Sequence, residues 1–567
     1  MTDIFTSKDP KLGTIVSVDT QNVLVEAESS EELRQVTVNQ LVSIAAENIG
    51  QHYIGIVSKI IRKEETNSNE DVTLSSYNAV RVVLVGTYSV NEGGTGNVFS
   101  RSLSSSPSIG SFCYLLQGEK LKLFMSCVSS SSEDVEAPVE IGVYSADHAS
   151  KAIINGDRFF QHHALIAGST GSGKSWTVAK ILEMVSNLPS SSAVLFDIHG
   201  EYSTLVGQGF VSYKIAGPSD SPNEKSDAIF LPYYLLSYEE MAALMLDRSD
   251  SNAPNQAMMF SKDVLSLKKA FLESVGQQNL ANQITIDSPT PYSLATLLSD
   301  LEKSDQEIVT SSAGRDKQGP YYGKLTRFIQ RLDAKAKDKR LNFLFNQDPT
   351  ILSFDYFQSL ALKILEPAAK GKRGVRIIDF SEVPSDILPL ITSLLARLIF
   401  SLQQWSDPDK RNPVALFCEE AHLYIPSASD DASGGVGVGT FERIAKEGRK
   451  YGVSLVIISQ RPSEVNQTVL SQLGNFVAMR LTNANDKSVV GNLIPDSLGD
   501  FVNSLPLLEV GEAVIVGDST ILPSRIRITP PTCKPRSATV NFWTEWSKPE
   551  LQSSIKEAVS SLLKQSK

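Results

Sequence analysis

The chain has 567 residues, enough for two to four domains at roughly 150 residues each. Its 41% hydrophobic and 21% charged residues exclude wholesale disorder and collagen-like structure. A net charge of −11, from 53 Lys and Arg against 64 Asp and Glu, argues against a globally basic nucleic-acid coat but allows a local basic channel.

Cysteine usage and apolar runs bear on the compartment. The four cysteines lie far apart without a CxxC pair, so we expect neither a disulfide scaffold nor a zinc ribbon. The first ten residues lack an apolar leader core, and the apolar run over 387–402 is interrupted by Pro389 and Arg397. We therefore expect a cytoplasmic protein without a membrane anchor.

The first part of the chain, residues 1–135, is rich in predicted strands. Segments 14–18, 35–38, 53–61 and 80–85 alternate in polarity or carry β-branched side chains. Short strands separated by turn residues predict a small β-barrel. Two serine-rich stretches, 102–108 and 126–132, are predicted to be loops, the second leading into a linker.

From about residue 136 strands alternate with helices, which predicts an α/β fold with a parallel sheet. The predicted core strands are apolar runs, as expected for strands buried on both faces: 164–167, 193–197, 374–380, 414–418 and 454–458. We predict a core in two parts, 136–234 and 366–530. A C-terminal extension with a helix would follow over 531–567.

A helical insertion is predicted between the two parts of the core, over 235–365. Ser237 and Glu240 have the spacing of a capping box. Four apolar stripes at helical spacing follow, beginning at Met241, Phe260, Leu294 and Leu325; the second comprises Phe260, Val264, Leu267 and Phe271. These stripes favour the core of a small helical bundle over a partner-binding groove.

Residues 168–175 read GSTGSGKS, a complete GxxxxGK[ST] loop between an apolar strand and a helical run. Glycines allow backbone amides to face phosphates, and the helix N-terminus favours negative charge. Lys174 is predicted to reach the β- and γ-phosphates, and Ser175 to ligate magnesium. The predicted ATP-binding residues are Gly168, Ser169, Thr170, Gly171, Ser172, Gly173, Lys174, Ser175 and Trp176.

A second motif separates a motor from a nucleotide kinase. The apolar strand over 414–418 ends in Glu419 and Glu420. One carboxylate can join the magnesium shell and the other can activate water. We predict that Glu419 takes the metal side and Glu420 acts as general base; the alternative is an acidic strand end that caps the next helix.

In this order the motifs resemble HerA-type ATPases of the HerA/FtsK group of hexameric DNA motors. The resemblance covers nearly the whole chain and includes GSTGSGKS, DIHGEY at 197–202, EEAH at 419–422, IAKEGRKYG at 444–452, SQRPSE at 459–464 and GEA at 511–513. It implies a RecA-like ATPase domain, an N-terminal barrel of the HAS type, and ATP and Mg²⁺ as cofactors.

The resemblance also implies roles for five further residues. Gln460 would sense the γ-phosphate. Arg443 or Arg449, with Arg443 preferred, would insert as a finger into the ATP site of the adjacent subunit. Asp197 and Glu201 would position water or magnesium, or else cap a helix.

Two positions depart from the family pattern. Glu419 stands where many relatives have Asp, so the side chain predicted to face the metal is longer here. Many relatives have an Arg directly before the His that precedes the strand of the phosphate loop, whereas this chain has His162 and His163. An arginine that acts on the ATP site of its own subunit from that position is therefore in doubt.

The resemblance implies a homohexamer that translocates or unwinds double-stranded DNA. An effector, either a NurA-type nuclease or a sirtuin-like or other nuclease effector, would dock on the barrel in DNA-end processing or anti-phage defence. In the alternative, the ring is a scaffold that activates such an effector and translocation is secondary. A conjugation or secretion ATPase should show a membrane anchor, and a nucleotide kinase would leave EEAH, SQRPSE and the barrel unexplained.

DNA contacts are harder to assign. The glycine-rich stretch 427–439 is predicted to be a mobile loop where pore loops of ring motors often emerge, although it is not basic. A basic run in the insertion is either a solvated face or a DNA contact: Lys335, Lys337, Lys339 and Arg340.

Overall fold

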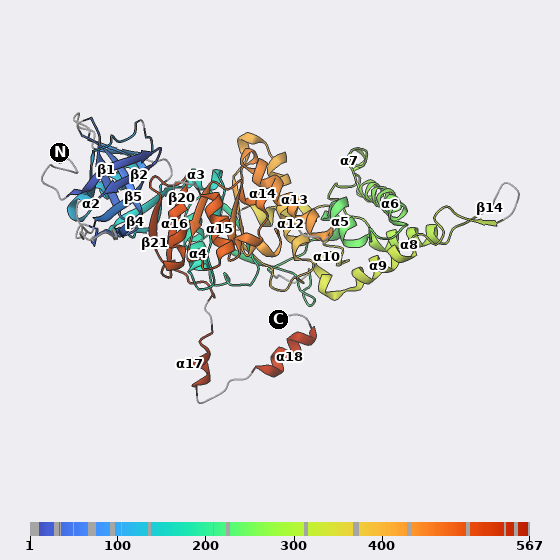
Figure 1. Cartoon of the computed structure of the whole chain (residues 1–567). Coiled ribbons are helices and arrows are strands. Elements are labelled where there is room, and N and C mark those ends of the chain that lie inside the picture. Colours follow the sequence, from blue (N-terminus) through green and yellow to red (C-terminus); the bar gives the residue numbers. More distant parts are fainter. Residues whose placement is uncertain are drawn as a thin grey trace. The chain divides into compact units, whose positions relative to one another are not determined.

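The structure is a computed structural model (Figure 1). It describes residues 11–27, 33–34, 36–48, 50–65, 75–90, 97–103, 105–133, 138–207, 209–222, 227–310, 316–366, 374–427, 432–494, 499–537, 540–548 and 554–564. The first ten residues and the expected domain boundary near 135 lie outside these ranges. The chain forms two compact units, one of Met1–Met184 and Ser454–Lys534, the other of Val185–Val453 and Pro535–Lys567.

The first unit begins with a closed six-stranded barrel, as predicted. Around the barrel the order is β2 (Asn22–Glu26), β1 (Lys11–Asp19), β7 (Phe112–Leu115), β3 (Leu41–Ala45), β4 (Gln51–Glu65) and β5 (Ser75–Ser89), and β5 closes onto β2. A short strand, β6 (Val98–Ser100), adds to β5. Apolar side chains that alternate along these strands fill the interior, which fixes the register of each strand.

Two local predictions in this region were wrong. Residues 36–38 are not a strand: residues 37–40 form a turn, in which the Thr37 amide donates to the Gln40 side chain at 3.0 Å; residue 35 is not described. The serine-rich stretch 126–132 belongs to a helix, α2 (Gly118–Glu133). Phe124, Met125 and Val128 are buried at helical spacing, and this apolar face outweighs the loop-like composition.

The rest of the first unit is a mixed sheet. Its parallel part is β18 (Val453–Ser459), β10 (Ala164–Ala167) and β19 (Asn475–Ala478). Four antiparallel strands continue it: β20 (Glu512–Gly517), β21 (Ser524–Ile528), β8 (Pro138–Tyr144) and β9 (Asp147–Asn155). Its helices are α3 (Gly156–Gln161), α4 (Lys174–Ser186), α14 (Gln467–Leu470), α15 (Ala484–Leu493) and α16 (Gly499–Ser504).

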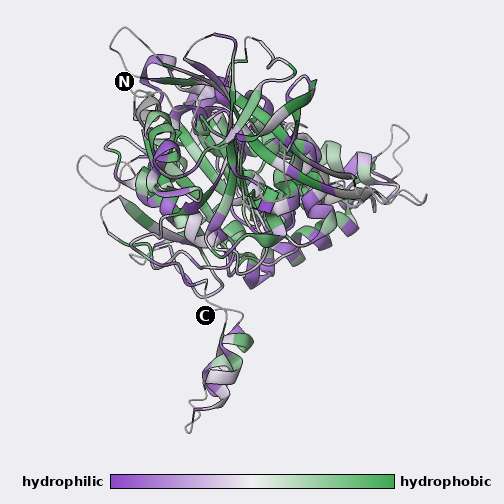
Figure 2. Cartoon of the chain, turned by 60° about the vertical axis from the view of Figure 1, so that its left-hand side comes forward, coloured by the Kyte–Doolittle hydropathy of each residue, from purple (hydrophilic) through white to green (hydrophobic). Residues whose placement is uncertain are grey.

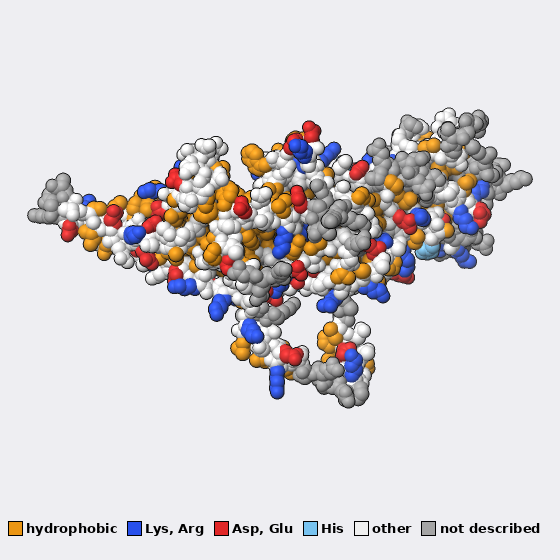
Figure 3. All heavy atoms as spheres, turned by 180° about the vertical axis from the view of Figure 1, so that it is seen from behind, with side chains coloured by type: hydrophobic (Ala, Val, Ile, Leu, Met, Phe, Trp, Pro, Cys, Tyr) orange, Lys and Arg blue, Asp and Glu red, His pale blue; other side chains and the backbone are white. Residues whose placement is uncertain are grey.

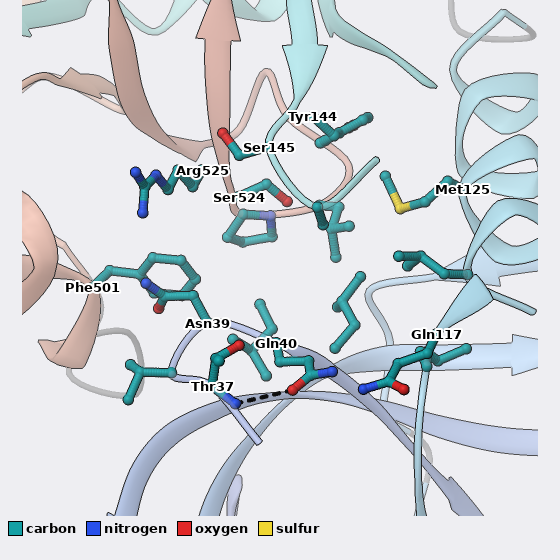
Figure 4. A pocket seen from close by; sticks show the side chains of 18 of the residues that line it. Thr37, Asn39, Gln40, Gln117, Met125, Tyr144, Ser145, Phe501, Ser524 and Arg525 are labelled. Carbon is teal, nitrogen blue, oxygen red and sulfur yellow. Dashed lines mark hydrogen bonds between the residues drawn. The ribbon is translucent and has the colours of Figure 1, made fainter. Parts of the chain in front are cut away.

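A cavity of about 340 Å³ lies where the barrel meets β8 and β21 (Figure 4). Thr37, Gln40 and Gln117 line it from the barrel side, and Tyr144 and Arg525 from the sheet. Arg525 is ion-paired with the buried Glu512, so its charge is already compensated. No residue of the GSTGSGKS loop lines this cavity.

The second unit contains a wholly parallel sheet. Its order is β13 (Ala228–Ile229), β12 (Phe210–Ile215), β16 (Gly374–Asp379), β11 (Ser192–Asp197) and β17 (Val414–Cys418). Strands and helices of the chain both carry hydrophobic segments, drawn green in Figure 2. Helices α12 (Leu388–Trp405) and α13 (Ala432–Glu447) pack on each other, with a 3.0 Å hydrogen bond between Ser393 and Thr440.

Helix α13 corrects the prediction of a mobile loop over 427–439. Residues 428–431 are not described, but 432–439 are helical. A Cβ at Gly437 would lie only 3.0 Å from the carbonyl oxygen of Pro389 on α12. The glycine therefore permits the close approach of two helices.

The helical insertion comprises α5 (Tyr238–Met245), α6 (Ala253–Ser274), α7 (Gln278–Ala281), α8 (Leu294–Asp305), α9 (Thr326–Lys337), α10 (Asn342–Phe345) and α11 (Tyr356–Leu365), with a hairpin of β14 (Ile308–Thr310) and β15 (Asp316–Gln318). The predicted capping box forms, since Ser237 and Glu240 each accept from the other's backbone amide. The buried Glu240 also pairs with the partly buried Arg397 of α12 at 2.6 Å, and this pair joins the insertion to the core.

Two short helices, α17 (Phe542–Trp546) and α18 (Ile555–Lys564), lie in the C-terminal extension. Among the described residues, no helix is long and apolar enough to cross a membrane.

Candidate nucleotide site

The GSTGSGKS loop is held by backbone hydrogen bonds from three neighbouring segments of the first unit. The Gly168 amide donates to Ser459 at the end of β18 at 3.3 Å, and the Ser169 amide donates to Arg480, just after β19, at 2.9 Å. The Gly511 amide donates to Ser172 at 2.9 Å. The loop shape is therefore fixed by the sheet that carries it.

Two glycines adopt backbone conformations that other residues rarely adopt. Gly171 and Gly173 have φ of 74° and 101°. A Cβ at Gly173 would also lie 3.1 Å from the Gly511 amide nitrogen. The spacing of the motif thus matches two turns of backbone that need glycine, as the phosphate-binding function requires.

Helix α4 begins directly at Lys174, so the backbone amides of its first turn face the loop. Lys174 is 8% exposed and Ser175 is partly buried. Thr177 anchors the first turn through a hydrogen bond from its hydroxyl to the Gly173 carbonyl at 3.1 Å. A phosphate in the loop would meet the amides, the ammonium and the hydroxyl together.

Gln460 lies beside the loop, directly after β18. The Thr170 hydroxyl donates to the Gln460 side-chain oxygen at 2.8 Å. Parallel pairing of β10 with β18, with Ala167 opposite Ser459, brings these two residues together. A movement of Thr170 in the loop would therefore act directly on the side chain of Gln460.

Arg480 was not anticipated from the sequence. Its carbonyl accepts from Ser169, and its guanidinium Nη2 lies 3.5 Å from the Gly171 carbonyl. The short strand before it, β19, pairs with β10 and delivers it to the loop. Arg480 could have been identified from the sequence only if the strand β19 had been predicted.

The two histidines before β10 hold structure. The His163 Nδ1 accepts from the Leu455 amide at 3.0 Å, which joins β10 to β18. The His162 Nδ1 lies 2.5 Å from the Asp518 carboxylate.

In the second unit, acidic residues gather at the carboxyl edge of the parallel sheet. Asp197 ends β11 opposite Asp379 of β16, and Phe196 pairs with Cys418, so Glu419 follows at the same edge. Asp379 is a further acid that was not anticipated. Parallel strands place their carboxyl ends together, which explains the cluster.

Asp197 is 1% exposed and accepts from the amides of Glu201 at 3.0 Å and Tyr202 at 2.9 Å. Burial raises the pKa of Asp197 to about 6, and Asp379 adds to the rise, while the two amides oppose it. The carboxylate therefore holds the turn after β11 in place, and it links Glu201 to the same edge.

Glu420 has a left-handed backbone, with φ of 45° and ψ of 44°. The residue is 6% exposed, and one carboxylate oxygen lies 3.4 Å from the Nδ1 of His422. A non-glycine residue in this conformation costs of order 1–3 kcal/mol and persists where surrounding structure imposes it, often at functional sites. Glu419 is 2% exposed.

Arg449 lies far from the acidic edge of its own unit. The Val414 amide, at the start of β17, donates to Gly452 at 2.7 Å. Arg449 is three residues before Gly452, whereas Glu419 is five residues further along β17, about 16 Å away at the rise of a strand. Arg449 therefore does not reach the Glu420 of its own subunit.

Arg443 and Arg449 differ in their surroundings. The guanidinium of Arg443 lies 5.0 Å from the centre of the Phe400 ring and contacts Gln404 at 3.3 Å and Glu447 at 3.4 Å. Arg449 is exposed, and within the described residues its side chain makes no hydrogen bond or ion pair.

The barrel, the parallel sheets and the phosphate loop define an α/β RecA-like P-loop ATPase with a helical insertion. A family model for the central domain of helicase HerA matches residues 139–399, and one for the HerA-like helicase C-terminal domain matches 359–540. The chain belongs to the HerA helicase family and is an ATP-hydrolysing enzyme.

Two relatives and one solved structure show what the chain is similar to. A DNA double-strand break repair helicase HerA of Sulfurisphaera tokodaii is 27% identical over 68% of both chains. A probable helicase of Methanocaldococcus jannaschii is 24% identical over 87% of this chain and 86% of its own. The bacterial conjugative coupling protein TrwB covers 73% of this chain and 94% of its own, with 13% identity and a TM-score of 0.44.

Proposed function

We propose that the chain is a Mg²⁺- and ATP-dependent motor that translocates or unwinds double-stranded DNA as a homohexamer. The observation that carries the proposal is the phosphate loop held against Gln460, together with two buried glutamates at the end of an apolar strand. Family membership supports DNA as the substrate, because the relatives are named as DNA break repair helicases.

The residues present fit a magnesium ion bound with ATP. Ser175 offers a hydroxyl and Glu419 a carboxylate, and Mg²⁺ prefers such oxygen donors. Within the described residues no group of three His, Cys, Asp or Glu side chains could hold a metal by itself. Mg²⁺ is commonly held by one or two side chains and substrate phosphates, and when bound it would neutralise charge on the phosphates.

Glu420 is proposed as the general base. Its carboxylate would take a proton from the attacking water, and His422 at 3.4 Å would orient that carboxylate. Gln460 would report the presence of the γ-phosphate through Thr170. Asp197 would keep Glu201 and the turn after β11 in position.

A finger from the adjacent subunit would complete the site. Arg449 is the better of the two candidates, because Arg443 is engaged by Phe400, Gln404 and Glu447. Arg449 lies at the opposite edge of its own sheet from Glu420, so it would act only on a neighbour. A head-to-tail ring supplies that geometry at every interface.

The DNA path and an effector are further parts of the proposal. On the face drawn in Figure 3, Lys and Arg side chains are interspersed with Asp and Glu. The net charge of −11 disfavours DNA on the outer surface, so DNA would be held inside the ring. A nuclease or sirtuin-like effector would dock on the barrel, in DNA-end processing or anti-phage defence.

The experiment that tests the proposal is ATP turnover with and without double-stranded DNA. The wild type should hydrolyse ATP in the presence of Mg²⁺, and linear duplex should raise the rate. Lys174→Ala, which removes the ammonium from the loop, should show neither activity. A turnover rate that duplex DNA leaves unchanged would argue against a motor.

A further inference from the structure

One face of α4, the helix that follows the phosphate loop, contacts another segment of the chain. Trp176, Lys180 and Glu183 are spaced by four and three residues, so they share a face of the helix. The segment that follows β21 lies along this face. The Thr532 amide and hydroxyl donate to the Glu183 carboxylate at 2.6 and 3.0 Å.

The same segment reaches Trp176. The ammonium of Lys534 lies 5.4 Å from the centre of the indole ring. This is the distance range of a cation–π contact, for which Trp is the best partner. Two bonds to Glu183 and one contact to Trp176 thus attach residues 532–534 to the first and third turns of α4.

The position of Trp176 relative to the phosphate loop is chemically informative. In a P-loop the backbone amides hold the α- and β-phosphates, and the helix starts at the lysine. Trp176 is the second residue after Lys174 and is only partly buried. The base is joined to the α-phosphate through the ribose, so it must lie near the first turn of this helix.

We propose that the base of the nucleotide stacks on the indole of Trp176, with the Lys534 ammonium beside it, and that residues 532–534 hold this platform in place. The inference rests on the proposed ATP site and adds to it the recognition of the base. Stacking on an aromatic side chain requires only a π-face, so ATP and GTP should bind comparably, and CTP, with its smaller ring, more weakly.

The test compares ATP with inorganic tripolyphosphate, which has no base. Binding is titrated calorimetrically for the wild type, Trp176→Ala, Trp176→Phe and Trp405→Ala, the last a matched control at an indole that is 87% exposed on α12. We expect Trp176→Ala to weaken ATP binding about tenfold and to leave tripolyphosphate binding unchanged. Trp176→Phe should retain most of the affinity, and Trp405→Ala all of it.

Several outcomes would overturn the proposal. They include unchanged ATP affinity in Trp176→Ala and an equal loss for ATP and tripolyphosphate, which would mean a damaged phosphate loop. If Trp176→Ala is poorly folded, tryptophan fluorescence of the wild type and of Trp176→Phe decides. ATP should quench the wild-type emission, whereas tripolyphosphate should not. In Trp176→Phe the quenching by ATP should be lost. Quenching that survives in Trp176→Phe also contradicts the proposal. A wild type that binds neither probe would refute the ATP site itself.

Discussion

At the scale of single residues, Glu419 and Glu420 are adjacent but differ in backbone. Glu419 directly follows β17, whereas Glu420 occupies the left-handed region with φ of 45°. The turn between them gives two neighbouring carboxylates different directions. This geometry supports the division of roles into a metal side and a base side.

Glu420→Gln tests the base role. The amide cannot take a proton from water, so turnover should fall at least about a hundredfold while ATP binding persists. Phosphate release and calorimetric titration measure the two quantities. Glu419→Gln is the matched variant and should weaken the dependence on Mg²⁺ instead. Wild-type turnover in Glu420→Gln would move the base role to Glu419 or Glu201.

The finger assignment is also a residue-scale question. Arg449→Ala should lower turnover about a thousandfold. Arg443→Ala should have a smaller effect, because the Arg443 side chain is already held by contacts to α12 and α13 of its own subunit. Mixing Arg449→Ala with Lys174→Ala subunits should partly restore activity, since an intact loop then meets an intact arginine. Full activity of Arg449→Ala alone, with loss in Arg443→Ala, would reverse the assignment.

At the scale of elements, the apolar core strands were predictable because burial on both faces makes them predominantly hydrophobic. The strands β12, β19 and β21 carry polar residues or are short, and nothing in their composition marks them. Arg480 was missed for this reason. Asp379 lies in a predicted strand, but its pairing with Asp197 depends on the strand order, which the sequence leaves open.

The same limit applies within the insertion. The periodicity placed Leu267 and Phe271 in the second apolar stripe, yet α6 buries Lys268 and Leu272. The Lys268 ammonium donates to the carbonyls of Ile286 at 2.6 Å and Ser288 at 2.7 Å. A lysine satisfied by backbone carbonyls can occupy a core position that polarity alone assigns to the surface.

Lys268 gives a pH-dependent prediction. Burial lowers the pKa of Lys268 to about 8, against 10.5 for the free side chain. Between these values the unfolded chain binds more protons, so this group makes stability rise with pH from about 8 to 10.5. Lys268→Met should lack the rise, and Lys262→Met, an exposed position on the same helix, should keep it. Thermal unfolding at several pH values measures this; parallel curves for Lys268→Met and the wild type would contradict it.

At the scale of the whole molecule, a trans-acting arginine requires an oligomer. Sedimentation analysis at micromolar concentration with Mg²⁺ and ATP should show a six-subunit species. Lys174→Ala should assemble less readily if bound nucleotide bridges the interface. A wild type that stays monomeric under these conditions would exclude the finger mechanism.

The central claim is that ATP hydrolysis moves double-stranded DNA through this protein, and displacement of a roadblock from linear duplex tests it most directly. The wild type with Mg²⁺ and ATP should displace a tightly bound protein from the duplex, and Glu420→Gln should not. DNA binding in the same assay should weaken with salt at a log–log slope of about −5, as expected if six subunits each contact one phosphate. No ATP-dependent displacement, with turnover indifferent to the presence and length of the duplex, would contradict the account.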